Sequence, residues 1–380
     1  MLKRTLVRCL MFTVLFGLAA FGSNWPGTAH AKEIPTLSFA YGTDTHTCLP
    51  NVAMKDPKAF ANKSMRINPV SDTQFELLKD GKVIAKFNVL VSKSGAESAT
   101  MMAQNQLDTV LCSNTAMLSA YDVGTNVKIL SPLQGGGIAM VMAPNTDFYG
   151  FDALKKYILN SKTPVKIGYH SATSGPRILI ESVLRDSGLK LTEDPADTTA
   201  NVLMVDLKGP QNLLGSIRSG AVDAWVGPSA NPENAVANGL GKIVMTLKDF
   251  PPQGKWTTFP CCVMSATGKV IQEHPEVIEA LVSVVADCIA YANANPDKFA
   301  EINAPIIGVS KDIIMASNKH IVYSNDSSPE WFNGIGMYFN AIKSMGKFNG
   351  RLKNADYDVV KKDVIDLSFL EKVKALKKGK

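Results

Sequence analysis

The stretch that decides the fold is Lys166–Leu189, KIGYHSATSGPRILIESVLRDSGL, which has the pattern of a strand, a polar loop and a helix. Apolar side chains alternate with others from Val165 to Tyr169, which is the period of a strand. Residues 171–175 are small and mostly hydroxyl-bearing. Pro176 suits the first turn of a helix, and Gly188 can end one. The stretch therefore predicts a strand–loop–helix unit.

The loop and first helical turn of this unit are compatible with an anion site. Free N–H groups and the positive end of the helix dipole favour a negative charge at a helix start. Arg177 lies in that first turn, where a cation is locally unfavourable unless an anionic group docks between the arginine and the amides. The alternative is an ordinary strand-to-helix turn with hydroxyl capping and a solvated arginine. At this point both interpretations stay open.

The rest of the chain continues the alternation of strands and helices. Strands are predicted at Thr36–Tyr41, Phe87–Val91 and Val202–Leu207, with helices between them. Such alternation is typical of α/β proteins with parallel sheets and helices on both faces, whose ligands bind at the carboxyl ends of the strands. Asp80–Gly81 predicts a hairpin turn, and Gln134–Gly137 predicts a flexible loop.

Two segments of the chain share one local plan. In each, a helix ends, an aspartate follows (Asp108 or Asp223), a short strand runs, and a polar loop opens a new helix. This weak internal echo predicts two α/β halves of similar construction.

Residues 1–31 have the composition of a cleavable secretory leader. Lys3, Arg4 and Arg8 form a charged region, an uncharged and mostly apolar run follows, and Ala29–Ala31 fits a small-x-small cleavage site. No other stretch is predicted to cross a membrane. The mature protein is therefore expected to be exported, in a bacterial periplasm or an equivalent space.

The charge of the chain argues against nucleic acid as a partner. The formal net charge is +6, and the leader carries three of these six charges, so the mature chain would carry only +3. The basic tail from Lys372 onward is predicted to be a solvated end.

The cysteines leave their redox state open. Of the six, Cys9 lies in the leader, so five remain and at least one cannot pair within the chain. An exported protein can form disulfides. Cys261 and Cys262 are adjacent and could bridge only through a strained ring.

The order of four blocks resembles that of the substrate-binding proteins of nitrate/sulfonate/taurine ABC importers. These are type II periplasmic binding proteins, also called the NMT1/THI5-like group. The blocks are LDTVLCSNTAML at 107–118, the stretch 165–189, VDLKGPQNLLGSIRSGAVDAWVGPSANP at 205–232, and HPEVIEALVSVVADCIAYANANPDKFAEI at 274–302. The resemblance covers residues 36 to about 370. The segment 55–86 and the grouping of cysteine and histidine depart from the usual pattern.

The resemblance implies two α/β lobes joined by two crossover strands, with a ligand held in a central cleft that a hinge motion closes. After the leader, lobe one would comprise residues 32–140 and 262–380, and lobe two residues 145–257. The crossovers are expected near Ile138–Pro144 and Trp256–Ser265.

Loops 41–47, 112–116, 134–138, 170–177 and 225–231 are expected to meet in the cleft. Hydroxyl groups in them can cap helices and still leave backbone N–H groups free for a ligand. The predicted ligand-binding residues are Asp44, Thr45, His46, Ser113, Asn114, Thr115, Gly137, His170, Ser171, Thr173, Ser174, Arg177, Trp225 and Cys261. For Trp225 the alternative is packing in the core.

Several cysteines and histidines fall in loops or strands near this cleft. Together they could ligate a soft metal or meet a thiol-reactive ligand. Cysteine is also commonly a small buried hydrophobic residue, and the chain has no CxxC or HExxH spacing. Neither a resident metal nor a cofactor is therefore predicted. The residues concerned are His46, Cys48, Cys112, His170, Cys261 and Cys262. In the arrangement that the resemblance implies, Cys48 and Cys112 flank neighbouring loops of lobe one and could also form a disulfide.

The leading functional hypothesis is a non-catalytic, monomeric, periplasmic receptor that delivers a small anionic or polar organic solute to an ABC permease and its ATPase. One alternative is a binding protein for a metal or a thiol-reactive ligand. Another is an enzyme similar to the pyrimidine synthases of the THI5-like group. The sequence has no GxSxG motif and only five scattered histidines, so no nucleophile–base pair is predicted. The identity of the solute is not predicted.

Overall fold

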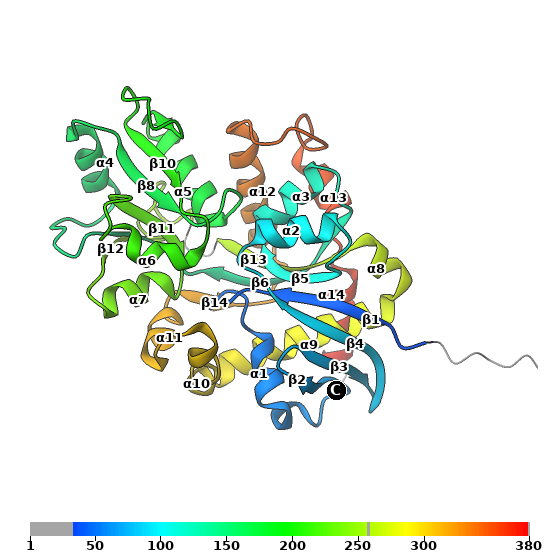
Figure 1. Cartoon of the computed structure of the whole chain (residues 1–380). Coiled ribbons are helices and arrows are strands. Elements are labelled where there is room, and N and C mark those ends of the chain that lie inside the picture. The colour runs from blue at the N-terminus through cyan, green and yellow to red at the C-terminus, as the bar shows by residue number, and fades with distance from the viewer. Residues whose placement is uncertain (1–32, 257–258, 379–380) are drawn as a thin grey trace, which may run out of the picture. The chain divides into compact units, whose positions relative to one another are not determined.

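Two β-sheets organise the chain (Figure 1). The computed structural model describes residues 33–256 and 259–378; the predicted leader, residues 1–31, lies outside them. The first sheet has eight strands in the order β14-β6-β13-β5-β1-β4-β3-β2. Its strands are β1 (Thr36–Tyr41), β2 (Met65–Ser71), β3 (Gln74–Lys79), β4 (Lys82–Val91), β5 (Thr109–Ser113), β6 (Val127–Gly136), β13 (Pro260–Thr267) and β14 (Ile321–Tyr323).

The second sheet has six strands in the order β12-β7-β11-β8-β10-β9. Its strands are β7 (Ile138–Met142), β8 (Val165–Tyr169), β9 (Leu191–Thr192), β10 (Val202–Asp206), β11 (Ala224–Pro228) and β12 (Lys242–Thr246). We call the elements around each sheet the first-sheet half and the second-sheet half.

The two sheets follow one plan, as the internal echo predicts. In the first, β4, β1 and β5 are parallel neighbours, and β13 is inserted antiparallel between β5 and β6. In the second, β10, β8 and β11 are parallel, and β7 is inserted antiparallel between β11 and β12. The chain enters each inserted strand from the other half of the molecule. β7 of the second sheet directly follows β6 of the first, and β13 of the first sheet follows β12 of the second. The prediction of an α/β fold with two halves and two crossovers is confirmed.

Helices cover both sheets. They are α1 (Pro50–Lys55), α2 (Gly95–Ala103), α3 (Asn114–Asp122), α4 (Phe151–Asn160), α5 (Gly175–Asp186), α6 (Leu213–Ser216), α7 (Asn231–Ala237), α8 (Gly268–Glu273), α9 (Pro275–Ala294), α10 (Pro296–Ile307), α11 (Lys311–Ser317), α12 (Pro329–Ser344), α13 (Tyr357–Asp363) and α14 (Ser368–Lys378). Short 3₁₀ turns lie at Pro57–Phe60 and Pro210–Asn212.

The segment 55–86, which departs from the family pattern, forms the antiparallel end of the first sheet. β2, β3 and β4 pair in sequence order. The predicted turn at Asp80–Gly81 is confirmed: Lys79 pairs with Lys82, and the two turn residues have φ of 49° and 80°. Positive φ at both central positions is the geometry of a type I′ hairpin turn.

The predicted flexible loop Gln134–Gly137 is wrong. Gln134, Gly135 and Gly136 complete β6, where they pair with β13 on one side and with β14 on the other. Strand pairing from two remote parts of the chain fixes this glycine-rich segment, although its local composition favours a loop.

One helix among the described residues, α9, is long and apolar enough to span a membrane by length and composition. Of its most apolar window, 72% is buried inside the fold, where α9 packs against α1, α10, α14 and β2. α9 therefore acts as a core helix of the first-sheet half.

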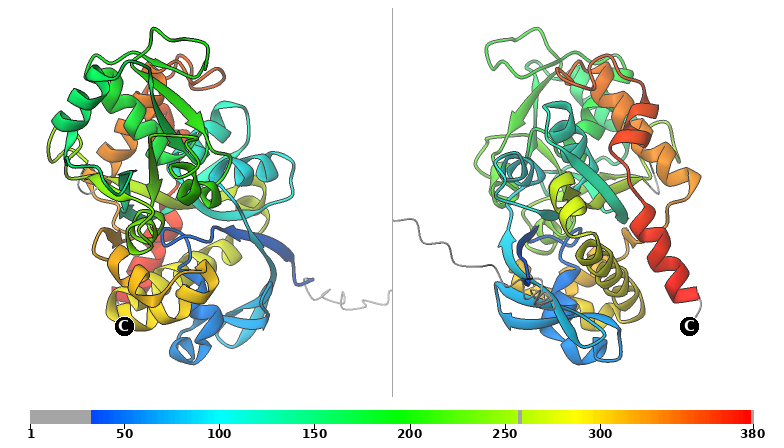
Figure 2. Two further views of the ribbon diagram at one scale, coloured as in Figure 1. Left: turned by 60° about the vertical axis from the view of Figure 1, so that its left-hand side comes forward. Right: turned by 90° about the vertical axis from the view of Figure 1, so that its right-hand side faces the viewer.

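The C-terminal helices run past both halves (Figure 2). α12 packs against α3 in the first-sheet half and against α5 in the second, whereas α14 lies beside α9 and β6. In the part of the basic tail that the structure describes, Lys372, Lys377 and Lys378 of α14 are exposed as predicted, whereas Lys374 is half-buried and Val373 is buried.

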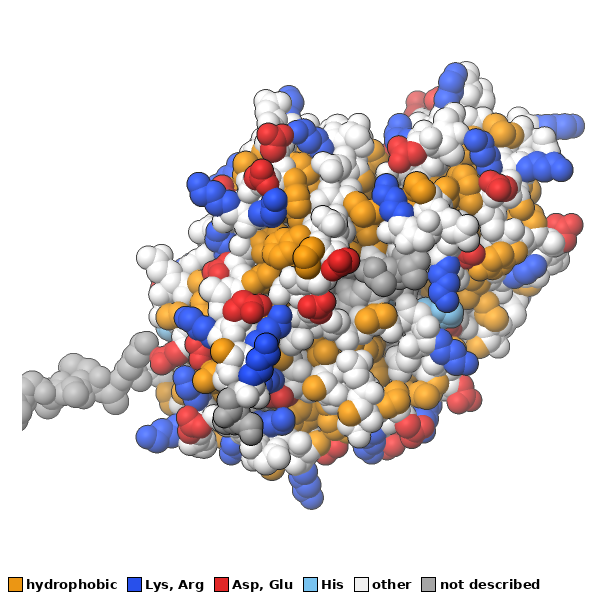
Figure 3. All heavy atoms as spheres, turned by 180° about the vertical axis from the view of Figure 1, so that it is seen from behind, with side chains coloured by type: hydrophobic (Ala, Val, Ile, Leu, Met, Phe, Trp, Pro, Cys, Tyr) orange, Lys and Arg blue, Asp and Glu red, His pale blue; other side chains and the backbone are white. Residues whose placement is uncertain are grey.

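On the face of the molecule shown in Figure 3, basic and acidic side chains are interspersed. This face therefore shows no extended basic track.

Candidate functional site

A small pocket lies where the carboxyl ends of parallel strands from both sheets meet. The strands are β1, β4 and β5 of the first sheet, and β8, β10 and β11 of the second; the start of β13 completes the wall. The volume of the pocket is about 60 Å³. It is lined by Gly42, Asp44, His46, Thr47, Ser92, Lys93, Ser94, Gly95, Ser98, Leu111, Cys112, Ser113, His170, Ser171, Thr173, Ser174, Gly175, Pro176, Pro210, Pro228, Cys261 and Cys262.

Three helices begin at this pocket, each capped by a serine. Ser94 accepts a hydrogen bond from the N–H of Glu97 at the start of α2 (3.2 Å). Ser113 and Ser174 cap α3 and α5 in the same way (3.4 Å each). A serine cap uses one free N–H of the first turn and leaves others unpaired. The positive ends of three helix dipoles therefore face one small volume, which favours an anionic or electron-rich solute.

The loop after β1 is held in shape by its own aspartate. Asp44 Oδ1 accepts hydrogen bonds from the N–H groups of His46 (2.9 Å) and Thr47 (3.0 Å) and from the Thr47 hydroxyl (2.9 Å). These bonds are those of an Asx-turn, which lets a short loop take a sharp bend. The loop thereby presents Asp44 and His46 at the pocket.

Two polar atoms of the second-sheet half are buried at the pocket without a partner among the described residues: His170 Nδ1 and Thr173 Oγ1. Burial lowers the pKa of His170 to about 4, so its ring is neutral at pH 7. A neutral ring and a hydroxyl can each donate or accept one hydrogen bond to a solute. Unpartnered buried polar groups cost free energy, which a bound polar solute would recover.

One side of the pocket carries the imidazole of His46 and the thiols of Cys261 and Cys262. Cys261 Sγ lies 3.5 Å from His46 Nδ1, and Cys262 Sγ lies 3.8 Å from Cys261 Sγ. A hydrogen bond from Cys262, helped by His46, lowers the pKa of Cys261 to about 6 despite burial. Burial by itself would lower the pKa of His46, but the adjacent Cys261 reverses this and the net pKa is raised. The thiol and the imidazole lie 215 positions apart in the chain, so no sequence motif signals this contact.

The structure places eight of the predicted ligand-binding residues at the pocket: Asp44, His46, Ser113, His170, Ser171, Thr173, Ser174 and Cys261. Their role in ligand binding stays a prediction.

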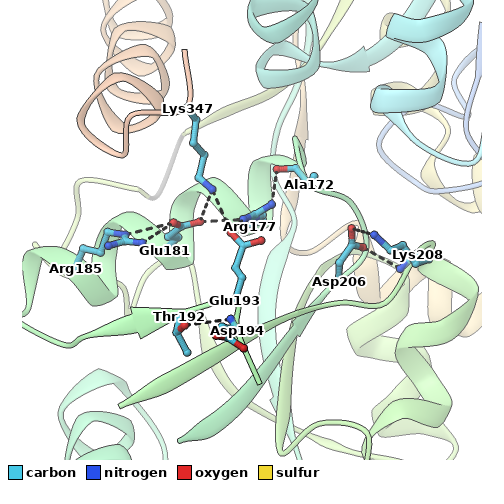
Figure 4. Close-up of polar contacts among 10 residues, drawn as sticks. All are labelled: Ala172, Arg177, Glu181, Arg185, Thr192, Glu193, Asp194, Asp206, Lys208 and Lys347. Carbon is cyan, nitrogen blue, oxygen red and sulfur yellow. Dashed lines mark hydrogen bonds and ion pairs between the residues drawn. The ribbon is translucent and has the colours of Figure 1, made fainter. Parts of the chain in front are cut away.

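Arg177 does not line the pocket. It is 3% exposed, its Nε lies 3.3 Å from Glu181, and its Nη1 donates to the carbonyl of Ala172 (3.1 Å). It also pairs with Glu193 (Figure 4). Its guanidinium lies 4.3 Å from the centre of the Tyr169 ring. These contacts satisfy its charge, which explains how a cation is tolerated in the first turn of α5.

The other predicted residues away from the lining support its shape. Asn114 donates to the carbonyls of Pro260 (3.1 Å) and Cys261 (2.9 Å), and so fixes the start of β13. The Thr115 hydroxyl donates to the carbonyl of Thr173 (2.6 Å), which links the two halves beside the pocket.

Thr45, Gly137 and Trp225 also lie off the pocket lining. Thr45 is fully buried behind the loop, and its carbonyl accepts from the Tyr323 hydroxyl (2.5 Å). Gly137 accepts a hydrogen bond from His46 Nε2 (2.9 Å) through its carbonyl. Its φ is +68°, and a Cβ there would lie 2.6 Å from that nitrogen, so only glycine fits. Trp225 packs in an apolar cluster with Val141 and its neighbours.

Sequence reasoning missed the contribution of α2. Ser92, Ser94 and Ser98 line the pocket, and Lys93 stands exposed beside them. The signal was present, because Ser94 followed by Glu97 has the spacing of a capping box. The backbone N–H of Lys93 donates to Glu97 (2.6 Å).

The five described cysteines are all buried and free of disulfides. The possible pair Cys48–Cys112 is therefore not formed in this structure.

Comparison with known proteins identifies the family. The model of the NMT1-like family matches residues 31–307, which is well over half of the chain. The chain belongs to the NMT1-like family. The resemblance stated from the four sequence blocks is thereby confirmed.

Solved structures of other proteins share the periplasmic binding protein fold of this NMT1-like chain. The periplasmic nitrate-binding protein NrtA from Synechocystis PCC 6803 superposes with a TM-score of 0.70 at 14% identity, over 90% of this chain and 89% of NrtA. The alkanesulfonate-binding protein SsuA from Xanthomonas axonopodis pv. citri, bound to MOPS, has a TM-score of 0.61 at 11% identity, over 83% and 95%. Among curated proteins, "Putative binding protein BAB2_1146" of Brucella abortus (strain 2308) is 22% identical over 327 residues, which are 82% of this chain and 93% of the relative.

Proposed function

We propose that this chain is the extracytoplasmic solute-binding protein of an ABC importer. It captures a small anionic or polar solute in the pocket between its two sheets. The observation that carries the proposal is the convergence of three capped helix N-termini on a pocket that also holds two unpartnered polar atoms. Backbone N–H groups at helix starts bind anions without requiring a basic side chain.

The proposal has support from proteins of the same fold. NrtA is described as nitrate-binding, and SsuA as alkanesulfonate-binding. Both ligands are small anions, and a nitrate-like or sulfonate-like group suits a site built from N–H and O–H donors. The volume of the pocket, about 60 Å³, also suits a small solute.

We further propose lobe boundaries at residues 32–140 with 262–380, and at 145–257, with hinge motion at the two crossovers. The leader at residues 1–31 would direct a monomeric mature protein to the periplasm, where it would meet a membrane permease and its ATPase. No turnover of the solute is expected, because the role of the pocket is capture and release.

The test is calorimetric titration of the mature protein, stripped of any bound solute, with nitrate, short alkanesulfonates and small carboxylates. One of these classes should give a saturable one-site response. Thr173→Val should weaken that response by about tenfold, because it removes one hydrogen-bond donor. Thr163→Val, in an exposed loop, is the matched control and should bind as the wild type does. A silent panel, or equal affinity in both variants, would contradict the proposal.

A further inference from the structure

We propose that His46, Cys261 and Cys262 form a binding site for a thiophilic divalent metal ion of the zinc class, with one coordination position open toward the pocket. Their ligand atoms all lie within 4.8 Å of one another, and all three residues are buried. The inference does not depend on the solute proposed above, because the capped helix starts form a different part of the wall.

The distances between the donor atoms match those of a tetrahedral metal centre. Zn–S bonds of about 2.3 Å and Zn–N bonds of about 2.0–2.1 Å place two sulfurs about 3.8 Å apart, and a sulfur and a nitrogen about 3.5 Å apart. The observed separations are 3.8 Å between the two Sγ atoms and 3.5 Å between Cys261 Sγ and His46 Nδ1. The third separation, from His46 to Cys262, is at most 4.8 Å. A small side-chain rotation would close it.

A strand irregularity brings the two sulfurs together. Adjacent residues of a regular strand point to opposite faces of the sheet, so Cys261 and Cys262 would normally diverge. The register between β13 and β6 shifts between Pro260 and Cys262, and again between Cys262 and Val263. Bulges of this kind re-aim side chains and occur next to functional sites. Here both thiols reach the pocket.

The histidine is oriented as a metal ligand would be. His46 Nε2 lies 2.9 Å from the carbonyl oxygen of Gly137. A carbonyl can only accept a hydrogen bond, so Nε2 carries the proton, and in the neutral ring Nδ1 carries the lone pair. The lone pair is therefore on the nitrogen that faces the thiols. Metal-binding histidines typically donate their second nitrogen to a carbonyl in this way.

The charge and the open side of the site also fit the proposal. Two thiolates balance the charge of a divalent ion, and a neutral imidazole adds none. Three protein ligands leave the fourth tetrahedral position free, as in zinc sites that accept an external ligand. The three residues line the pocket, so this position would face the solvent or a solute donor atom.

The test uses the mature full-length protein, reduced and treated with chelator, and titrated with Co²⁺ alone. One equivalent should produce thiolate-to-metal charge transfer and the visible bands of a tetrahedral ion, and Zn²⁺ should abolish both. Substitutions outside the ligand shell weaken metal binding by ~10–100-fold. A larger loss of Co²⁺ affinity is expected from each of the ligand variants, Cys261→Ser, Cys262→Ser and His46→Gln. Cys288→Ser is the matched control, because Cys288 is a buried thiol of α9 that does not line the pocket.

A second measurement needs only the wild-type protein, so it tests the proposal even if the variants fail to fold. In the wild-type protein, Zn²⁺ should protect Cys261 and Cys262 from alkylation, as read by peptide mass. Saturating Co²⁺ without a thiolate band, an unchanged Co²⁺ affinity in either cysteine variant, or alkylation that Zn²⁺ does not slow would each overturn the proposal. Titration of the chelator-treated protein with the solute panel is a separate measurement, so failure of the solute proposal and failure of the metal proposal are distinguishable.

Discussion

Glu181 of α5 is a buried carboxylate that pairs with three basic side chains. It is 1% exposed, and its carboxylate pairs with Arg177 (3.3 Å), Arg185 (3.1 Å) and Lys347 (3.3 Å) (Figure 4). Glu181→Gln keeps the size of the side chain but leaves the buried Arg177 with Glu193 as its one remaining acidic partner. Loss of one member of a buried ion pair costs about 3–5 kcal/mol. We expect the free energy of unfolding, measured by urea denaturation, to fall by about 3 kcal/mol.

The control for this prediction is Glu301→Gln, which removes the exposed partner of Lys298 within α10. Exposed pairs of this kind are worth about 0.5 kcal/mol or less. An equal fall in the free energy of unfolding in the two variants would mean that the buried ion pairs of Glu181 stabilise the fold no more than an exposed pair does.

At the scale of single elements, the β3–β4 hairpin depends on the backbone conformation of its turn. Gly81 has φ of +80°, and a Cβ added there would meet no atom within 4 Å. Gly81→Ala therefore costs only the strain of a left-handed backbone, about 1–2 kcal/mol. Thermal unfolding should show a lower midpoint for this variant.

Gly215→Ala is the matched control for the hairpin. Gly215 lies in α6, also has open space around it, and has no positive φ. The same substitution should stabilise the protein there by up to about 1 kcal/mol, because alanine favours the helix. Destabilisation of similar size at both sites would contradict the backbone argument.

At the scale of the whole molecule, one hydrogen bond links the two halves beside the pocket. The Thr115 hydroxyl of α3 donates to the Thr173 carbonyl, which precedes α5. Thr115→Val keeps the shape but removes this bond, worth about 1 kcal/mol. Amide hydrogen exchange in residues 170–174 should therefore become about fivefold faster, because local opening costs less free energy.

Thr100→Val provides the comparison for the link between the halves. The Thr100 hydroxyl donates to the Ala96 carbonyl within exposed α2 (3.0 Å) and connects no other part of the chain. Exchange in residues 170–174 should match the wild type in this variant. Unchanged exchange in Thr115→Val would mean that this bond does not hold the halves together.

Much of the architecture follows from local pattern. The alternation in Lys166–Leu189 correctly predicts β8, its loop and α5, because strand and helix periods are properties of neighbouring residues. The serines at positions 113 and 174 are visible as caps from their place before a helix. The Asp80–Gly81 turn is equally local. The sequence by itself thus determined the fold class and the hydroxyl-rich loops of the candidate site.

Only the tertiary structure decided which side chains reach the pocket, because that depends on contacts between residues far apart in the chain. Arg177 does not line the pocket, since it pairs with Glu181 and with the distant Glu193. Gln134–Gly136 form a strand because β13 and β14 pair with them. Cys261 and Cys262 face one way because of a register shift against β6, and His46 meets them because its loop is fixed by Asp44 and Gly137. None of these pairings leaves a periodic trace in the sequence, so packing alone assembled the thiol–imidazole cluster.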